Sequence, residues 1–380
     1  MPQPIKIGLV AGESSGDQLG AGLIQALKAH YPNASFSGIG GDKMLAEGFE
    51  TLFPIDRLSV MGFVEPLKRL PELFKIRKIL FNHFVENQYE LVVGIDSPDF
   101  NLGLELKLRE KGIKTAHYVS PSVWAWRQGR VKKISKAVDL MLTLLPFEEA
   151  FYQQHKVPVV CVGHPLAEEL SLETNTVEAR QQLGLTDAPV LTVMPGSRSG
   201  EVDTLGKLFF DVAQQCQNKI PGLQLVIPAA SPERREQLSL ILKEYPSLPV
   251  TLLDGQSLTA MSAADVVLLS SGTSALEAML LKKPMVVSYR MGKYTYKLLS
   301  KMVKIPYVSL PNLLADEMLV PELLQDDATV ENLREAVLNF FSQPNYVAEL
   351  KQRFTKIHQS LQYGGSETAA KALVELIRSD

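Results

Sequence analysis

The sequence predicts an α/β protein with two Rossmann-like domains, each a parallel sheet covered by helices, and with helices at the C-terminal end. Its 380 residues exceed the roughly 150 residues of a typical domain. Apolar, β-branched runs alternate with helix-period segments in both halves, as in parallel sheets covered by helices. Between the halves, residues 163–188 contain Pro165 and a polar run at 173–176 but no strand pattern. We therefore expect one domain over residues 1–165, a second over 166–345, and helices over 346–380 that pack back on the first domain.

The apolar runs place the strands. In the first half they cover residues 5–11, 91–95, 115–119, 140–144 and 159–162. In the second half they cover residues 190–194, 223–227, 250–253, 266–269 and 285–288. Beyond about residue 330 the periodicity is entirely helical, and Gly364 and Gly365 precede a last helix over 366–377 with Ser366 or Thr368 as its N-cap.

Composition excludes several classes of protein. With 46% hydrophobic and 21% charged residues, the chain is in the range of ordinary globular proteins. A net charge of -3 gives no general affinity for nucleic acid, so attraction to phosphates must come from local patches. No signal-peptide pattern precedes the first strand, and no run of about 20 apolar residues occurs. We expect a cytoplasmic protein.

Cysteine and histidine give no sign of a metal site. Cys161 and Cys216 are far apart and lack the paired spacing of zinc or disulfide frameworks, so we expect two buried thiols in a reducing compartment. The six histidines are scattered, and of these only His117 lies beside a candidate loop. We assign no metal ligand and expect no cofactor.

Three loops of the first domain follow strands, where ligands of open α/β sheets bind. Residues 12–17 (Gly-Glu-Ser-Ser-Gly-Asp) lead into a helix expected from Gln18, and their two acids suit hydroxyls better than phosphates. In residues 94–100, Asp96 is placed to accept a proton from an attacking hydroxyl, whereas Asp99 is expected to cap the next helix. Residues 117–127 carry both tryptophans, which either pack in the core or form a wall beside a sugar or lipid.

Two loops of the second domain suggest a nucleotide. Residues 195–201 contain Gly196, Ser197 and Arg198 before a helix, so backbone N–H groups, a helix dipole and a guanidinium can hold a phosphate. In residues 270–277, small side chains let a diphosphate approach the helix start, and Glu277 can hold a ribose diol through two hydrogen bonds.

One segment, residues 66–84, is both apolar and basic. It packs as an amphipathic helix on the sheet or contacts anionic lipid headgroups at a membrane surface. The residues assigned to membrane contact are Leu67, Leu70, Leu73, Phe74, Lys75, Arg77 and Lys78.

These features together resemble the lipid A disaccharide synthases, a family of GT-B glycosyltransferases. The matching stretches are residues 12–17, 94–101, 118–127, 195–198, 271–277 and 308–314, in order along nearly the whole chain. The resemblance implies an inverting, metal-independent transfer from UDP-2,3-diacylglucosamine to 2,3-diacylglucosamine-1-phosphate. The products are a β(1→6)-linked disaccharide phosphate and UDP. It also implies two domains facing a cleft, and peripheral association with the inner membrane.

The resemblance also assigns roles to residues. It implies Asp96 as the general base, with Asp99 as the alternative, and Glu13 and Ser15 on the acceptor side. The donor side comprises Arg198, Gly196, Ser197, Gly272, Thr273, Ser274, Glu277 and Asn312, and Trp124 and Arg127 complete the substrate contacts. Two other readings stay open: a soluble UDP-N-acetylglucosamine transferase or epimerase, and a non-catalytic sugar-nucleotide-binding protein. Acyl chain length and a homodimer also stay open.

Overall fold

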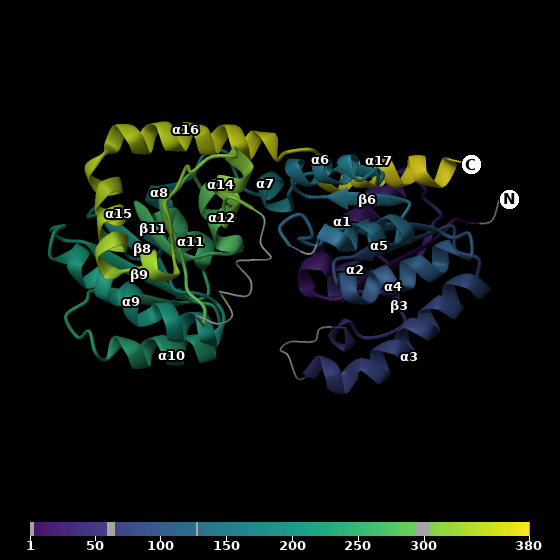
Figure 1. Ribbon diagram of the computed structural model, residues 1–380, viewed down its shortest axis with the longest axis horizontal. Helices are drawn as coiled ribbons and strands as arrows, with labels where there is room; N and C mark the ends of the chain where they lie inside the picture. Colours follow the sequence, from purple (N-terminus) through teal and green to yellow (C-terminus); the bar gives the residue numbers. More distant parts are fainter. Residues whose placement is uncertain (1–3, 59–64, 127, 293–295, 297–304, 380) are drawn as a thin grey trace. The chain divides into compact units, whose positions relative to one another are not determined.

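The protein divides into two compact units. The computed structural model describes residues 4–58, 65–126, 128–292, 296 and 305–379. Unit 1 comprises Met1–Glu168 and Leu361–Asp380, and unit 2 comprises Glu169–Ser360 (Figure 1). The chain therefore passes from unit 1 to unit 2 three residues after the boundary expected at 165, and it returns to unit 1 for its last 20 residues.

The described residues of unit 1 form a seven-stranded parallel sheet. Its order is β3-β2-β1-β4-β5-β6-β7, so the direction of strand addition reverses between β1 and β4. The strands are β1 (Lys6–Ala11), β2 (Ser35–Ile39), β3 (Glu50–Thr51), β4 (Leu91–Ile95), β5 (Lys114–Tyr118), β6 (Leu140–Thr143) and β7 (Val159–Cys161). The helices are α1 (Ser14–His30), α2 (Asp42–Ala46), η1 (Ile55–Arg57), α3 (Glu65–Glu86), α4 (Pro98–Arg109), η2 (Gln128–Arg130), α5 (Val131–Ala137), α6 (Pro146–Gln154), α7 (Pro165–Glu169) and α17 (Gly365–Arg378).

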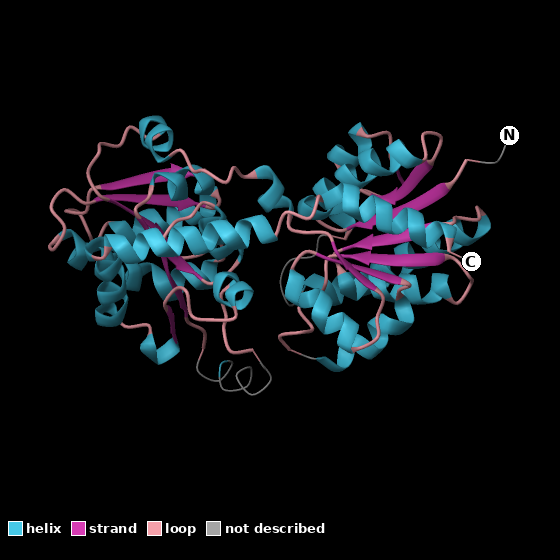
Figure 2. Ribbon diagram, turned by 90° about the horizontal axis from the view of Figure 1, so that it is seen from above, coloured by secondary structure: helices cyan, strands magenta, loops and turns pink. Residues whose placement is uncertain are grey.

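Helices cover both faces of this sheet (Figure 2), and the strands are apolar on both sides as a result. One core contains Leu9 of β1 together with Leu23 of α1 and Leu373 of α17. The other contains Val10 of β1 together with Leu80 of α3 and Leu104 of α4. Successive residues of β1 therefore contribute to opposite cores.

The described residues of unit 2 form a six-stranded parallel sheet with the order β10-β9-β8-β11-β12-β13, so the same reversal occurs between β8 and β11. The strands are β8 (Val190–Met194), β9 (Gln224–Ala229), β10 (Val250–Asp254), β11 (Val266–Ser270), β12 (Met285–Tyr289) and β13 (Glu322–Leu324). The helices are α8 (Thr176–Gln182), α9 (Ser199–Gln217), α10 (Pro232–Leu242), α11 (Ser257–Ala263), α12 (Thr273–Leu280), α14 (Leu310–Ala315), η3 (Gln325–Asp327), α15 (Val330–Ser342) and α16 (Pro344–Ser360). The predicted fold class, two Rossmann-like parallel sheets, is confirmed.

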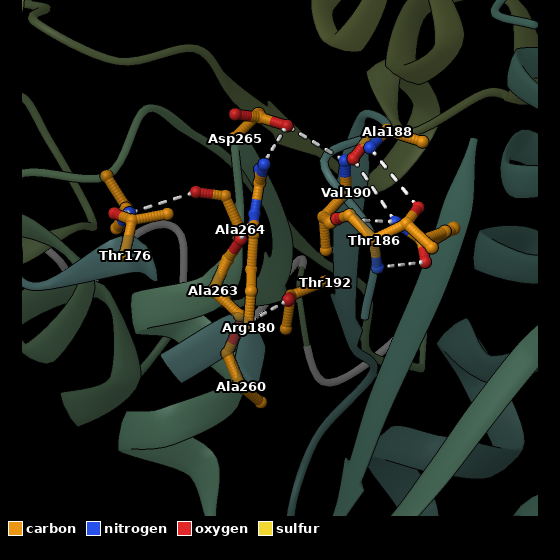
Figure 3. A network of polar contacts seen from close by, with 12 residues as sticks. Thr176, Arg180, Thr186, Ala188, Val190, Thr192, Ala260, Ala263, Ala264 and Asp265 are labelled. Carbon is orange, nitrogen blue, oxygen red and sulfur yellow. Dashed lines mark hydrogen bonds and ion pairs between the residues drawn. The ribbon is translucent and has the colours of Figure 1, made fainter. Parts of the chain in front are cut away.

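A polar network holds the amino ends of β8 and β11 in unit 2 (Figure 3). Asp265 Oδ2 accepts hydrogen bonds from Arg180 Nη2 of α8 at 2.8 Å and from the Val190 N–H at 2.8 Å. Arg180 Nε also donates to the Ala263 carbonyl at 3.0 Å. The segment that links the two sheets in sequence is thus anchored to the second sheet by α8.

All ten predicted strands occur within one or two residues of their expected bounds. Three further strands, β2, β3 and β13, were not predicted, because β2 (Ser-Phe-Ser-Gly-Ile) has a turn-like composition and the other two contain only two and three residues. Two helix starts also differ. Helix α1 begins at Ser14 rather than near Gln18, and α17 begins at Gly365 with Gly364, φ 87°, at the N-cap in place of Ser366 or Thr368.

The terminal helices belong to different units, which corrects the expectation that residues 346–380 pack together on the first domain. Helix α16 buries Leu350 and Phe354 in unit 2 and contacts α12, α14 and α15. Helix α17 buries Ala370 and Leu373 against α1 in unit 1. Each helix follows its own apolar stripe, and helical periodicity alone does not identify the sheet that receives it.

Candidate active site

A cavity of about 510 Å³ lies at the carboxyl ends of β8 and β11 in unit 2. This is the point where the strand order reverses, at which open α/β sheets bind their ligands. All seven donor-side residues predicted in the loops after these two strands line the cavity: Gly196, Ser197, Arg198, Gly272, Thr273, Ser274 and Glu277. The structure thus brings together residues 195–201 and 270–277, which are far apart in the sequence.

The loop after β8 differs in detail from its expected role. The N–H groups of Ser197 and Arg198 donate to Glu201 Oε2 at 3.0 and 3.2 Å, so they do not point freely at a phosphate. A Cβ at position 196 would lie 2.5 Å from Glu201 Oε2, which explains the glycine. The Arg198 guanidinium pairs with Glu201 Oε1 at 3.2 Å and is 83% exposed. In this loop the positive charge of Arg198, rather than the backbone, is available to an anion.

The loop after β11 offers backbone groups and a carboxyl. Helix α12 starts at Thr273, and its N-cap residue, Gly272, has no capping side chain. The first N–H groups of the helix and its dipole therefore favour an anion. One turn later Glu277 lines the cavity, and burial raises the pKa of its carboxyl above the usual range. Polar groups in cavities with burial-raised pKa values are frequent in functional sites.

The sequence reasoning missed part of this cavity. Pro228, Ala229 and Ala230 at the end of β9, and Gly255 and Ser257 after β10, also form its walls. Their small or apolar side chains carry no chemical signal. The position of β9 beside β8, and of β10 beside β9, would have indicated them, because parallel strands end at the same edge of a sheet.

Asn312 is not brought to the cavity, in contrast to its expected donor-side position. Its side chain is fully buried. Its Nδ2 donates to the Val320 carbonyl at 2.9 Å and to Glu322 Oε1 at 2.8 Å, and its Oδ1 accepts from the Val320 N–H at 2.9 Å. These bonds attach α14 to the segment that enters β13, so the side chain has a structural role in this conformation.

A second cavity, of about 390 Å³, lies at the carboxyl ends of β4 and β5 in unit 1. Asp96 lines it, and the other lining residues are Pro98, Val119, Ser120, Pro121, Ser122, Val123, Trp126 and Arg130. Among the described residues, none donates a hydrogen bond to the Asp96 carboxylate. The Asp96 carboxylate therefore has oxygen atoms free to accept a hydrogen bond from a bound hydroxyl.

The loop after β1 contacts the loop after β4, since a Cβ at Gly12 would collide with the Ser97 side chain. Glu13, at the N-cap of α1, and Ser15 in the first turn are both exposed. Asp17 points inward instead. Its carboxylate accepts from the Gly41 N–H at 2.8 Å and the Lys43 N–H at 3.0 Å, and so caps α2, which the sequence did not indicate.

Asp99 does not cap α4 as expected, because Ser97 occupies the N-cap position. The Asp99 carboxylate is exposed and pairs with Arg130 Nη2 at 2.6 Å. This pairing sets Arg130 at the edge of the Asp96 cavity.

The two tryptophans have different surroundings. Trp124, the one assigned to substrate, donates from Nε1 to the buried Glu148 Oε1 at 3.0 Å and packs edge-on against Phe147. Trp126 lines the cavity with Asp96 instead. Arg127 lies outside the described residues. His117 does not border the cavity, because it is fully buried in β5 and its Nδ1 lies 2.8 Å from Glu105 Oε1.

Helix α3 has an exposed face that is apolar and basic. Leu70, Phe74 and Ile79 are 39%, 58% and 42% exposed, and Lys75 and Lys78 are exposed beside them. Two predicted members of the face are only partly exposed. Leu73 packs against the core, and the Arg77 guanidinium lies 4.9 Å from the ring centre of Phe100 and donates to the Asp99 carbonyl at 3.0 Å. The Leu67 side chain lies outside the described residues.

In the described part of the chain, both cysteines are buried free thiols, as predicted, and no cluster of histidine, cysteine, aspartate and glutamate side chains could hold a metal ion. The described helices include none with the length and apolar character needed to cross a membrane.

Two Rossmann-like parallel sheets, with a cavity at the strand reversal of the second, define a protein of the GT-B fold class. Solved structures share this fold. UDP-GlcNAc 2-epimerase from Neisseria meningitidis has a TM-score of 0.63 at 16% identity over 98% of this chain and 99% of its own. MurG from Acinetobacter baumannii has a TM-score of 0.60 at 14% identity over 97% of this chain and 99% of its own. At these identities the likeness shows the fold alone.

Sequence relatives identify the family. The model of the lipid-A-disaccharide synthetase family matches residues 7–376. The lipid-A-disaccharide synthase of Cellvibrio japonicus is 54% identical over 375 residues, which are 98% of each chain. That of Alcanivorax borkumensis is 53% identical over 374 residues, again 98% of each chain. The chain belongs to the lipid-A-disaccharide synthase family, and it is a glycosyltransferase of lipid A biosynthesis. The resemblance stated from the sequence is confirmed.

Proposed function

We propose that this enzyme transfers 2,3-diacylglucosamine from UDP-2,3-diacylglucosamine to 2,3-diacylglucosamine-1-phosphate, forming the β(1→6) disaccharide phosphate and UDP. The observation that carries the proposal is the cavity of unit 2, where seven predicted donor-side residues meet at the reversal of the strand order. Its volume of about 510 Å³ lies within the range of small-molecule sites.

The donor's diphosphate is proposed to lie between Arg198 and the start of α12. The guanidinium and the N-terminal N–H groups of the helix both favour negative charge. As the bond from the sugar to UDP breaks, charge develops on the diphosphate, and groups already aimed at that position lower the barrier. Glu277, at the same cavity, is placed to accept hydrogen bonds from the ribose hydroxyls.

Asp96 is proposed as the general base on the acceptor side. The oxygen of the acceptor's 6-hydroxyl forms a bond to the anomeric carbon while the bond from that carbon to UDP breaks. The hydroxyl proton passes to Asp96, and the electron pair leaves with UDP. An attack from the face opposite UDP inverts the configuration at the anomeric carbon. Glu13 and Ser15, exposed at the start of α1, are proposed to contact the acceptor.

The acyl chains require access to a membrane, and we assign this contact to the exposed face of α3. Leu70, Phe74 and Ile79 supply apolar area, while Lys75 and Lys78 attract anionic headgroups. The proposed location is the cytoplasmic side of the inner membrane, with peripheral attachment.

The substrate class is tested by offering acylated and non-acylated UDP-glucosamine with the lipid phosphate acceptor. We expect UDP release with the acylated donor only. UDP release only from the non-acylated donor would exclude the proposed substrate. For the membrane contact, Phe74→Ser combined with Lys75→Gln should weaken binding to anionic vesicles at low salt, whereas Val177→Ser, at an exposed apolar position of unit 2, should not. Equal binding by both variants would remove α3 from the contact.

A further inference from the structure

The turn that presents Asp96 has an unusual backbone. Asp96 and Ser97 have φ values of 52° and 46°, and Val119, which lines the same cavity, has a φ of 79°. Non-glycine residues seldom adopt positive φ, and a β-branched residue such as valine does so least readily. Such conformations persist only where the surrounding structure enforces them, and they are frequent at active sites. The structure around residues 96 and 97 should therefore contain groups that hold this turn.

Asn101 is such a group. It lies on α4, fully buried, and its Nδ2 donates to the Asp96 carbonyl at 2.8 Å and to the Val10 carbonyl at 3.1 Å. Val10 belongs to β1 and Asp96 follows β4, so one amide ties the turn to the neighbouring strand. The Asp96 N–H is held from the other side, where it donates to the Tyr118 carbonyl of β5 at 2.8 Å.

The orientation of this amide is determined by its partners. Both partners are carbonyl oxygens, which only accept hydrogen bonds, so the NH₂ group and not the oxygen must face them. The site is also closely packed. A Cβ at Gly94 of β4 would lie 2.7 Å from Asn101 Cβ, so the strand approaches the helix more closely there than any other residue at position 94 would permit. Asn101 therefore cannot move aside without releasing the turn.

We propose that Asn101 is a positioning residue, which holds the left-handed turn at Asp96 and Ser97 and thereby directs the Asp96 carboxylate into the acceptor cavity. The inference rests on the proposed role of Asp96 as base. Asn101 itself contacts two backbone carbonyls and acts on the reaction through Asp96 alone.

The first test compares Asn101→Ala with Leu108→Ala, which removes a fully buried side chain of the same helix that belongs to the apolar core. Because a displacement of about 1 Å costs on the order of 100-fold in rate, we expect Asn101→Ala to lower kcat at least about tenfold. The KM values for both substrates should stay within about threefold. Leu108→Ala should lower the melting temperature and leave kcat near that of the wild type. A kcat within twofold of wild type in folded Asn101→Ala would overturn the proposal.

The second test places Asn101→Ala in an Asp96→Asn background. If Asn101 acts through the carboxylate, the double variant is no slower than Asp96→Asn alone. The same fold loss in both backgrounds would overturn the positioning role while leaving the base intact. Near-normal turnover of Asp96→Asn alone would instead reject the base, and the inference with it. If Asn101→Ala is not recovered folded, the same cycle uses Asn101→Ser, whose shorter hydroxyl cannot reach both carbonyls.

Discussion

The buried carboxyl of Glu148 should make the stability of unit 1 depend on pH. The side chain is 4% exposed, its Oε1 accepts from Trp124 Nε1 at 3.0 Å, and its Oε2 accepts from the Leu145 N–H at 3.1 Å. Burial raises the pKa of Glu148 from 4.5 to about 7. The native protein therefore binds this proton more tightly than the unfolded chain does.

The size and sign of the effect follow from the pKa shift. A rise from 4.5 to about 7 corresponds to about 3 kcal/mol between the two protonation states. Because the native pKa is the higher one, this contribution is complete below pH 4.5 and is lost as the pH rises through 7. Between these values the contribution of Glu148 to the free energy of unfolding should fall by about 1.4 kcal/mol per pH unit.

Urea unfolding followed by tryptophan fluorescence measures this dependence. Both tryptophans of the chain, Trp124 and Trp126, lie in unit 1, so their emission reports that unit. We expect Glu148→Gln, which cannot lose a proton, to lack this contribution, so that the free energy of unfolding of the wild type falls relative to that of the variant by about 1.4 kcal/mol per pH unit between pH 5 and 7. Glu149→Gln, at the neighbouring position, is the control and should retain this contribution. Identical slopes in wild type and Glu148→Gln would refute the reasoning.

The remaining predictions concern unit 2. Arg198→Gln should lower kcat/KM about 100-fold or more in steady-state assays, as expected for loss of a group that stabilises developing charge. Arg198→Lys should recover only part of this kcat/KM because an ammonium lacks the planar fork of a guanidinium. An unchanged kcat/KM in Arg198→Gln would remove Arg198 from the leaving-group site. Glu277→Gln should raise the KM of the UDP-sugar. With a donor that carries deoxyribose in place of ribose, wild type and Glu277→Gln should have the same KM. A difference in KM that persists with this donor would exclude contact between Glu277 and the ribose. Lys283 is buried, and burial lowers the pKa of its amine from 10.5 to about 7. Between these pH values the unfolded chain binds this proton and the native protein does not. The contribution of Lys283 to the free energy of unfolding is therefore complete above pH 10.5 and is lost as the pH falls toward 7. In urea unfolding followed by circular dichroism, the wild type should gain about 1.4 kcal/mol per pH unit relative to Lys283→Met over this range; a difference that does not change with pH would contradict the buried neutral amine.

Much of the fold could be predicted because it depends on local patterns. Apolar runs such as that of β4 indicate a buried strand by their composition alone. The loops after β8 and β11 combine small residues with Arg198 and Glu277, a combination that indicates a phosphate site. The strands that escaped prediction are those with little local signal. In β2, for example, two serines and a glycine conceal buried positions.

What could not be predicted depends on contacts between distant residues. Asp17 has the same sequence context whether it faces a ligand or caps α2, and only the 24-residue return of the chain to Gly41 decides this. Trp124 and Trp126 are two positions apart, yet Trp124 donates a hydrogen bond to Glu148 of α6, whereas Trp126 lines the cavity. Asn312 belongs to a recognisable motif, but its hydrogen bonds to Val320 and Glu322 form only once β13 is in place.

The return of α17 to unit 1 has a consequence for biosynthesis. Unit 2 is one continuous stretch, Glu169–Ser360, whereas unit 1 needs residues from both ends of the chain. Until α17 has been synthesised, the apolar surface of α1 that packs with it, in the core that contains Leu23 and Leu27, is not covered. Nascent unit 1 therefore completes its core only after unit 2 has been synthesised, and the apolar surface of α1 is exposed to chaperones in the meantime.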